Sequence, residues 1–338
     1  MAGTQYNLQF ERLCQALQLG RINGTPEAIS GGLLHRMYGV ETTQGKYAIK
    51  ALNPQVMLRP TARRHMIDSE RVATIASRRI PVSQARMFNG RVIQEIDNQF
   101  YLVFDWVNGR SLNVNEINSV HSEKMGVILA DLHQMDFSNL GIKKDSSDYG
   151  LSINWNWYLQ KGRENNLPWV NMLNESMNKL DQWTNQGNVS AKLLSSNLVI
   201  SHRDLDAKNV MWNADNPIII DWESAGYVNP MLELTETAVY WSETENGDID
   251  KKRYLAFIRS YKKRYGTLKA NWNGVLCNGF LSKLAWLEYN LKRSLWIECS
   301  DTEEQYMGTI QVTDTIDALR RYANNIIHLE NYLNYEID

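Results

Sequence analysis

The chain has few cysteines and no long apolar run. Its 338 residues include only Cys14, Cys277 and Cys299, which lie far apart and have no metal-ligand spacing. We expect them to be reduced, as in the cytoplasm. No run of about 18 apolar residues occurs, so no membrane-spanning helix is expected. The N-terminal stretch has an amphipathic pattern without a signal-peptide core, and the predicted location is therefore cytoplasmic.

The chain also lacks a basic stripe. The net charge is −2 and the sequence pI is about 6.3, so nucleic acid is not an expected partner. A hydrophobic content of 43% describes a soluble globular protein that is long enough for two lobes. No feature indicates an obligate protein partner.

The most informative segment reads HRDLDAKNVMWNADNPIIID. An apolar run at 210–212 and a β-branched run at 218–220 flank residues of the kind that favour turns. This pattern predicts a β-hairpin centred near Asp215. Such a hairpin places Asn209, just before the first strand, opposite Asp221, at the end of the second.

The predicted hairpin gathers groups that suit phosphoryl transfer. An Asn209 amide oxygen and an Asp221 carboxylate are hard ligands of the kind that Mg²⁺ prefers. Asp204 lies on the preceding loop, where its carboxylate can accept the proton of an incoming hydroxyl group. A positioned general base contributes roughly 10²–10⁴ in rate. We therefore predict that Asp204 is catalytic and that Asn209 and Asp221 bind Mg²⁺.

The motifs HRDLDAKN and IIIDWE resemble the catalytic segment of the protein-kinase-like superfamily. They are most similar to its small-molecule branch, the aminoglycoside phosphotransferases and the choline and ethanolamine kinases. Asp221-Trp222-Glu223 stands where protein kinases have Asp-Phe-Gly, and Asp206 stands where they have Lys. No Ala-Pro-Glu follows. These departures count against a protein substrate.

The resemblance implies an α+β, two-lobed protein-kinase-like fold, with a small β-rich N-terminal lobe and a larger, mostly helical C-terminal lobe. Pattern changes agree, because residues 25–106 look mainly β and the chain from about residue 230 looks helical. We divide the chain at a hinge, with residues 1–106 as the nucleotide-binding lobe and residues 107–338 as the catalytic and substrate-binding lobe.

A lysine and a glutamate upstream complete the pattern. GKYAIK, which ends at Lys50, reads as a turn into a strand, and Glu70 lies in the helical pattern HMIDSERVATIA. In the resembled family, the lysine of Ala-Ile-Lys contacts the α- and β-phosphates. We expect Glu70 to hold Lys50 as an ion pair.

Two further segments are expected to contact the nucleotide, ATP or GTP. Ser30, Gly31 and Gly32 precede a strand pattern, and the two glycines allow backbone N–H groups to approach phosphate oxygens. The segment FYLVFDW reads as a buried strand that enters the linker between lobes. In the resembled family this linker presents its backbone to the adenine edge, here at Asp105 and Val107.

Acidic residues after the hairpin indicate a cationic acceptor. Residues 221–250 contain eight acids, Glu223 and Glu236 among them, and no lysine or arginine. Such a surface beside the catalytic loop would attract a small cationic alcohol. The alternative is a solvated helical face, which is the usual fate of a charge run.

Tryptophan is concentrated in the C-terminal part of the chain. Trp155 and Trp157 lie in the polar run SINWNWY and are candidates for an exposed substrate lip, and Trp241 is a further candidate. An exposed indole ring can stack on a sugar or hold an alkylammonium group. Most of the other tryptophans are expected in the core.

Three kinds of function follow. The first is a kinase that transfers the γ-phosphate of ATP or GTP to a hydroxyl of a small cationic alcohol, similar to aminoglycoside phosphotransferases. A choline- or ethanolamine-type kinase is the alternative within this class, since IDWESAGYVNP resembles their catalytic-aspartate region. A non-catalytic nucleotide-binding scaffold predicts a damaged catalytic set, which this chain does not have. A protein kinase would need an activation segment that is not evident.

Overall fold

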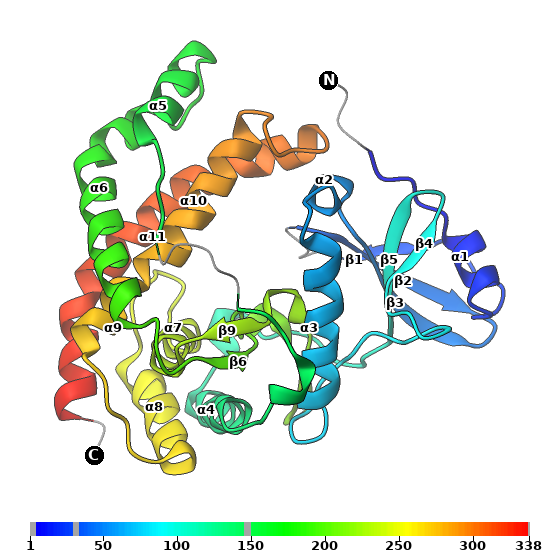
Figure 1. Cartoon of the computed structure of the whole chain (residues 1–338), viewed down its shortest axis with the longest axis horizontal. Helices are drawn as coiled ribbons and strands as arrows, with labels where there is room; N and C mark the ends of the chain where they lie inside the picture. Colours follow the sequence, from blue (N-terminus) through cyan, green and yellow to red (C-terminus); the bar gives the residue numbers. More distant parts are fainter. Residues whose placement is uncertain (1–4, 30–33, 145–149, 337–338) are drawn as a thin grey trace. The chain divides into compact units, whose positions relative to one another are not determined.

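The structure is a computed structural model that describes residues 5–29, 34–144 and 150–336. The chain forms two compact units (Figure 1). The first contains the described residues of 1–113, 135–142 and 202–226, and the second contains those of 114–134, 143–201 and 227–338. The predicted division at residue 107 lies near the first of these changes. The segment 202–226, with the predicted hairpin, however, belongs to the same unit as the N-terminal sheet.

The first unit is built on a five-stranded antiparallel sheet with the strand order β1-β2-β3-β5-β4. Its strands are β1 (Glu27–Ile29), β2 (Arg36–Thr42), β3 (Gly45–Ala51), β4 (Gln94–Ile96) and β5 (Gln99–Asp105). The helices of this unit are α1 (Phe10–Ala16), α2 (Pro54–Met57), α3 (Ala62–Ala76) and the short 3₁₀ helix η2 (Ser138–Leu140).

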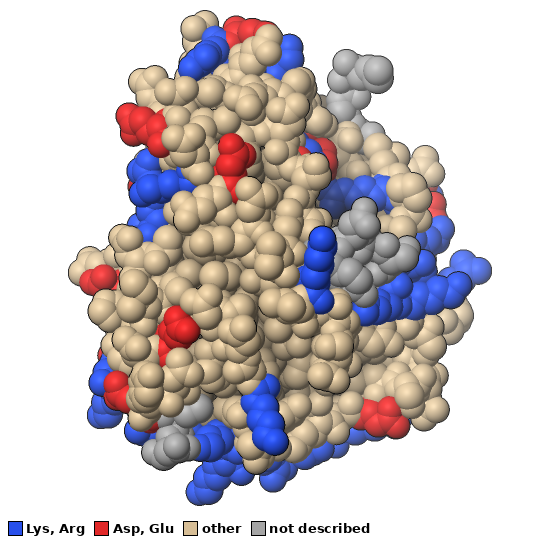
Figure 2. All heavy atoms as spheres, turned by 60° about the vertical axis from the view of Figure 1, so that its left-hand side comes forward, with Lys and Arg blue, Asp and Glu red and all other residues tan. Residues whose placement is uncertain are grey.

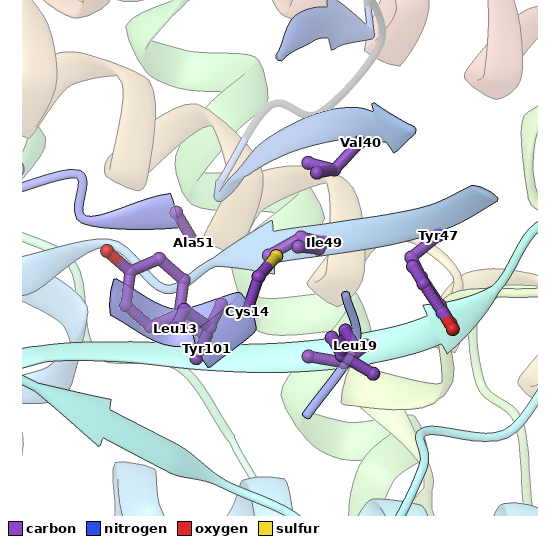
Figure 3. Packing of buried hydrophobic residues seen from close by; sticks show 9 residues of the cluster. Leu13, Cys14, Leu19, Val40, Tyr47, Ile49, Ala51 and Tyr101 are labelled. Carbon is purple, nitrogen blue, oxygen red and sulfur yellow. The ribbon is translucent and has the colours of Figure 1, made fainter. Parts of the chain in front are cut away.

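Both faces of the central strands are buried, which explains the continuous apolar run in β5. Successive side chains of a strand point to opposite faces. Tyr101 and Val103 belong to one core cluster, which includes residues of α1 (Figure 3). Leu102 and Phe104 belong to another, which includes Met66 of α3. In β3, Ile49 faces the first cluster, so Lys50 points to the opposite face.

The hairpin predicted around Asp215 is confirmed. Strands β7 (Val210–Asn213) and β8 (Asn216–Ile219) pair with Val210 opposite Ile219 and Asn213 opposite Asn216. A two-residue turn therefore joins them, as predicted around Asp215. The 3₁₀ helices η3 (Ala207–Asn209) and η4 (Trp222–Ser224) flank the hairpin.

Gly109 allows the linker after β5 to lie against this hairpin. Arg110 pairs with Trp212 through two backbone hydrogen bonds, at 3.2 and 2.8 Å. A Cβ atom at Gly109 would lie 2.5 Å from the carbonyl oxygen of Trp212, and the residue has a φ of 151°. Glycine is required at this position because any side chain would clash with β7.

The second unit is mostly helical. Its helices are η1 (Val114–Glu116), α4 (Ser119–His133), α5 (Trp155–Glu164), α6 (Val170–Leu193), α7 (Pro230–Tyr240), α8 (Lys251–Tyr265), α9 (Trp272–Asn278), α10 (Phe280–Ser294) and α11 (Thr302–Tyr335). A two-stranded sheet joins β6 (Val199–Ser201) to β9 (Gly226–Val228), whose first residue is the last of the other unit. The predicted α+β class is confirmed.

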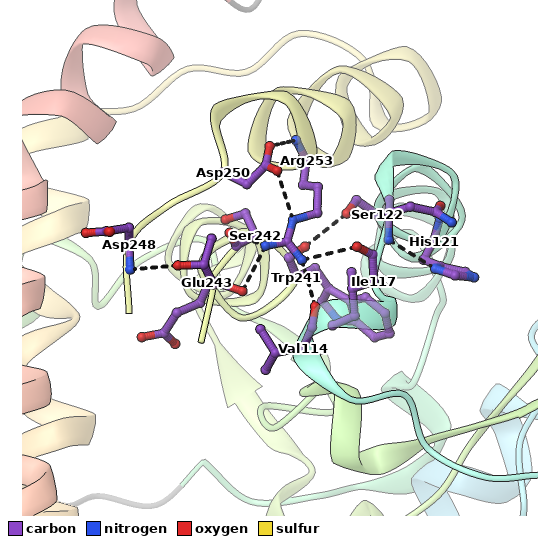
Figure 4. A network of polar contacts seen from close by, with 12 residues as sticks. Val114, Ile117, His121, Ser122, Trp241, Ser242, Glu243, Asp248, Asp250 and Arg253 are labelled. Atoms are coloured by element: carbon purple, nitrogen blue, oxygen red, sulfur yellow. Dashed lines mark hydrogen bonds and ion pairs between the residues drawn. The ribbon is translucent and has the colours of Figure 1, made fainter. Parts of the chain in front are cut away.

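Buried polar side chains connect the helices of this unit. His133 in α4 contacts Glu233 in α7 at 2.7 Å and Tyr261 in α8 at 2.8 Å. Arg253 of α8 donates to the carbonyl oxygens of Val114, Ile117, Ser242 and Glu243 (Figure 4). The contacts of His133 with Tyr261, and of Arg253 with Val114 and Ile117, join residues more than 100 positions apart.

Within the described parts of the chain, no helix combines the length and the apolar character that a membrane crossing needs.

Candidate active site

The residues predicted for catalysis and metal binding come together within the first unit. The amide N–H of Ile220 donates to the carbonyl oxygen of Asn209 at 2.9 Å, so Asn209 lies beside the end of the strand that leads to Asp221. The side-chain Nδ2 of Asn209 donates to the carbonyl oxygen of Asp204 at 2.8 Å and to its Oδ2 at 2.9 Å. The loop and the hairpin therefore hold the three side chains in one neighbourhood.

His202 supports this loop. Its Nδ1 accepts the N–H of Asp204 at 3.2 Å, and its Nε2 donates to the carbonyl oxygen of Ile220 at 3.0 Å. The ring also packs edge-on against Trp222 at 4.7 Å. One buried imidazole thus ties the segment with Asp204 to the segment with Asp221.

Two residues of the site have left-handed backbone conformations. Arg203, directly before Asp204, has a φ of 67°, and Asp221 has a φ of 60°. Residues other than glycine adopt this region only when their surroundings hold them there, and such residues gather at functional sites. Left-handed backbone therefore occurs at Asp221 and directly before Asp204.

Lys50 lies between two carboxylates. Its Nζ is 2.5 Å from Oδ1 of Asp221 and 2.9 Å from Oε2 of Glu223. Burial alone would lower the pKa of Lys50, but the two carboxylates more than offset that effect and raise it. Burial would likewise raise the pKa of Asp221, and the Lys50 ammonium instead lowers it to about 2. Lys50 and Asp221 therefore form an ion pair at neutral pH.

The predicted ion pair between Lys50 and Glu70 is wrong for this conformation. Oε2 of Glu70 accepts the backbone N–H of Ala85 at 2.8 Å, and Lys50 takes Asp221 and Glu223 as partners. The N–H of Ala85 belongs to an irregular segment between α3 and β4, and it supplies a local hydrogen bond that the motif does not reveal. Burial raises the pKa of Glu70 to about 7.

Glu223 is part of this cluster rather than of a separate acidic surface. Its side chain is 17% exposed, and burial raises its pKa to about 7 against the attraction of Lys50. Sequence analysis assigned it to the acceptor and missed its contact with Lys50. The available signal was its spacing, two residues after Asp221 at the end of the same hairpin.

A lysine that sequence analysis left without a role lies beside Asp204. Nζ of Lys208 is 3.7 Å from Oδ2 of Asp204 and 3.6 Å from Oδ2 of Asp206. Burial raises the pKa of Asp204, partly opposed by this ammonium group. A raised pKa makes the carboxylate a better proton acceptor.

The donor set fits a hard divalent cation. Asp221 offers a carboxylate whose side chain is 33% exposed, and Asn209 turns its Nδ2 toward Asp204, so that the amide oxygen is the end left for a cation. No group of three or more His, Cys, Asp or Glu side chains among the described residues could hold a metal ion by itself. Further ligands would have to come from phosphate oxygens or water.

Of the backbone segments predicted to bind the nucleotide, the structure describes only the one at Asp105 and Val107. Ser30, Gly31 and Gly32 lie outside the described residues. Asp105 ends β5 opposite Tyr47, and Val107 follows in the linker. The carboxylate of Asp105 is 80% exposed and lies 3.6 Å from Arg86.

The tryptophans chosen for an exposed lip differ from one another. Trp157 is 40% exposed, as expected, but Trp155 and Trp241 are buried, at 2% and 0%, so for them the expected exposure is wrong. Trp155 begins α5, and the helical period places it on the buried face with Tyr158 and Leu159.

The acids after the hairpin are dispersed. Glu236 accepts a hydrogen bond from Ser282 at 2.8 Å, Glu233 is buried against His133, and Asp250 caps α8. Figure 2 shows acidic and basic side chains interspersed with uncharged ones on the face that it draws. A hollow of about 870 Å³ in the second unit is lined by Arg259, Lys262 and Lys263 and by no acid, which does not suit a cation.

A family model described as "Phosphotransferase enzyme family" matches residues 25–272. Among curated protein sequences, none matches this chain.

Solved structures share the fold. A spectinomycin phosphotransferase, in complex with ADP and spectinomycin, is 11% identical with a TM-score of 0.66, covering 94% of this chain and 99% of its own. A microcompartment-associated aminopropanol kinase is 14% identical with a TM-score of 0.64, covering 94% and 98%. An ethanolamine kinase from Plasmodium vivax is 16% identical with a TM-score of 0.59, covering 88% and 83%. The predicted protein-kinase-like fold is confirmed.

Proposed function

Because the chain belongs to the phosphotransferase enzyme family, we propose that it transfers the γ-phosphate of ATP or GTP to a hydroxyl group of a small cationic alcohol. The observation that carries the proposal is the contact of Lys50 with Asp221 at 2.5 Å, in the same unit as the Asp204–Asn209 pair. This arrangement places a buried cation, a proposed metal ligand and a proposed general base in one unit.

Each side chain has a task that its surroundings support. Asp204 orients the hydroxyl group and accepts its proton at the carboxylate, whose pKa is raised by burial. Lys50 neutralises charge on the phosphates, and Lys208 adds a second positive charge beside Asp204. The backbone of Ser30, Gly31 and Gly32, and that of Asp105 and Val107, would hold the nucleotide.

Asn209 and Asp221 would hold Mg²⁺. When bound, the ion supplies further neutralisation of the phosphate charge. It would also compete with Lys50 for the carboxylate of Asp221. Glu223 is a second partner of Lys50. The lysine therefore keeps one carboxylate beside it when Asp221 turns to the metal ion.

The acceptor is proposed from the class of relatives and from acids in the chain. Similar structures include an enzyme with spectinomycin bound, an aminopropanol kinase and an ethanolamine kinase, and an amine is common to these acceptors. Trp157, which is exposed, and Glu236, which is half-buried, remain the acceptor candidates. The second candidate function is a choline- or ethanolamine-type kinase, which the ethanolamine kinase likeness favours.

The test is nucleotide turnover by the purified full chain. ADP or GDP release is measured with Mg²⁺ and a panel of aminoglycosides, spectinomycin, choline, ethanolamine and aminopropanol. We expect Mg²⁺-dependent release that one class of amino alcohol stimulates. Stimulation by choline or ethanolamine alone would select the second candidate. The absence of turnover with every alcohol and both nucleotides would contradict the proposal.

A further inference from the structure

The side chain of His35 is buried beside the phosphate-handling residues. It directly precedes β2, follows the glycine pair by three residues, and is 3% exposed. Its Nδ1 accepts the backbone N–H of Asn53 at 2.8 Å, which connects the start of β2 to the segment after β3. Because Nδ1 accepts, the ring proton must reside on Nε2.

Nε2 of His35 lies near the carboxylate of Glu223. Nε2 lies 3.5 Å from Oε2 of Glu223, the same oxygen that accepts from Lys50 at 2.9 Å. Nε2 makes no hydrogen bond of good geometry to any described residue. A buried donor without a hydrogen bond is unfavourable, and the carboxylate of Glu223, at 3.5 Å, is an acceptor that Nε2–H would gain by approaching.

The imidazole acts as a neutral group. Burial, together with the charge of Lys50, lowers the pKa of His35 to about 3. A neutral ring can donate from Nε2 while it accepts at Nδ1, which a doubly protonated ring cannot do. The contact with Asn53 and the contact with Glu223 therefore depend on the same tautomer.

We propose that His35 is a positioning residue, whose Nε2–H holds the Glu223 carboxylate against the Lys50 ammonium. His35 thereby connects the strand that follows the glycine pair to the segment that follows Asp221. The inference rests on the proposed phosphotransfer, in which Lys50 must meet the phosphates in one orientation.

Two substitutions test the two ring nitrogens of His35 one at a time. In His35→Asn the amide oxygen takes the place of Nδ1, so the contact with Asn53 is kept and the donor toward Glu223 is lost. In His35→Gln the amide nitrogen takes the place of Nε2, so the donor is kept and the contact with Asn53 is lost.

We expect His35→Asn to lower kcat about 10-fold, as for loss of a hydrogen bond to a charged group, with little change in the KM for ATP. His35→Gln should keep kcat within about 3-fold and lower the Tm by roughly 2–4 °C.

A double-mutant cycle tests whether the effect passes through Glu223. In the Glu223→Gln background, His35→Asn should reduce kcat less than about 2-fold further, because coupled residues are not additive. A full further 10-fold loss would overturn the proposal. Equal kcat for the Asn and Gln variants would show a structural role only, and a raised KM with unchanged kcat would indicate direct contact with the nucleotide.

A second readout does not depend on turnover. Trace acetylation of the full chain, followed by mass spectrometry, measures the reactivity of Lys50. Release of Glu223 leaves the ammonium group with one carboxylate partner fewer and more accessible to the reagent, so His35→Asn should increase acetylation of Lys50 several-fold, and His35→Gln should not. Unchanged labelling in both variants would overturn the proposal even in a protein without turnover. Loss of turnover in the wild type, with the expected labelling, would contradict the proposed function alone.

Discussion

Buried polar groups occur in both units, but their partners differ. In the first unit, Lys50 has two carboxylates within 2.9 Å, and Glu70 and Glu223 both have a pKa near 7. In the second, Arg253 lies 3.5 Å from Asp250, but its hydrogen bonds go to four backbone carbonyl oxygens, which cannot titrate. The Lys50 cluster, which consists of Lys50, Glu70, Asp221 and Glu223, holds more carboxyl groups than cations. It can change partners when ligands arrive, whereas the Arg253 contacts fix one arrangement.

This comparison predicts that substitution of a side chain proposed to act in phosphotransfer reduces turnover more than stability, and that substitutions in the Arg253 network do the reverse. The largest expected effect is at Asp204. Asp204→Asn keeps an acceptor for Nδ2 of Asn209 but removes the proposed base, so kcat should fall roughly 10²–10⁴-fold. Stopped assays of ADP release measure the loss, and circular dichroism checks that the Tm is unchanged.

Asp206→Asn is the matched control for this prediction. Asp206 caps η3 by accepting the N–H of Lys208, and asparagine can keep that contact. Its kcat should stay within about 3-fold of the wild type. A loss as large as that of Asp204→Asn would mean that the charge of the loop, and not one base, controls the reaction.

The opposite response is expected for Arg253. Arg253→Met leaves four carbonyl oxygens without their donor in a buried place, and the free energy of unfolding should fall by about 4 kcal/mol. Urea denaturation followed by circular dichroism measures the change. Lys252→Met, at an exposed position of the same helix, should change it by less than about 0.5 kcal/mol. Equal effects of the two variants would contradict the structural role of Arg253.

Gly109 tests the backbone contact that holds the catalytic hairpin. Gly109→Ala places a Cβ atom 2.5 Å from the carbonyl oxygen of Trp212 at a positive φ, and should destabilise the protein by about 3 kcal/mol. Gly90→Ala provides the control, because Gly90 has a φ of 75° but open space around it. Its expected loss of about 1 kcal/mol reflects the backbone conformation alone. The difference between the two variants in urea denaturation measures the clash, and the absence of a difference would show that the linker moves freely.

The catalytic hairpin could be predicted from the sequence because its information is local. A turn-forming segment between an apolar run and a β-branched run determines the register, and the register places Asn209 beside the end of the second strand. The burial of Trp155 was missed for the opposite reason. Its polar neighbours suggest exposure, but the period of α5 decides which side of the helix faces the core.

Partner choice within the Lys50 cluster could not be predicted in the same way. Glu70, Asp221 and Glu223 are all plausible partners of one lysine, and the outcome depends on the N–H of Ala85, which occupies Glu70. His35 was also overlooked, since its role depends on a tautomer that Asn53 determines through a backbone contact. Such choices are made by tertiary contacts that no motif encodes.

The smallest expected effect concerns Glu70 and pH. Its pKa is raised in the folded state from 4.5 to about 7, so between these values the native protein binds more protons than the unfolded chain. Stability therefore decreases as the pH rises through this window, and Glu70→Gln should remove that decrease. Relative to the wild type, the variant should gain about 2 kcal/mol in free energy of unfolding between pH 5 and pH 8. Urea denaturation at the two pH values measures the gain, and parallel profiles would contradict the raised pKa.

The same variant decides whether Glu70 acts on Lys50 during turnover. Glutamine can still accept the N–H of Ala85, so the fold around Glu70 should persist. Because Lys50 is paired with Asp221 and Glu223, we expect kcat of Glu70→Gln to stay within about 3-fold of the wild type. A loss greater than 10-fold would mean that Glu70 replaces Asp221 as the partner of Lys50 once nucleotide and Mg²⁺ are bound. The Lys50 cluster would then exchange partners in each cycle, which the Arg253 network cannot do.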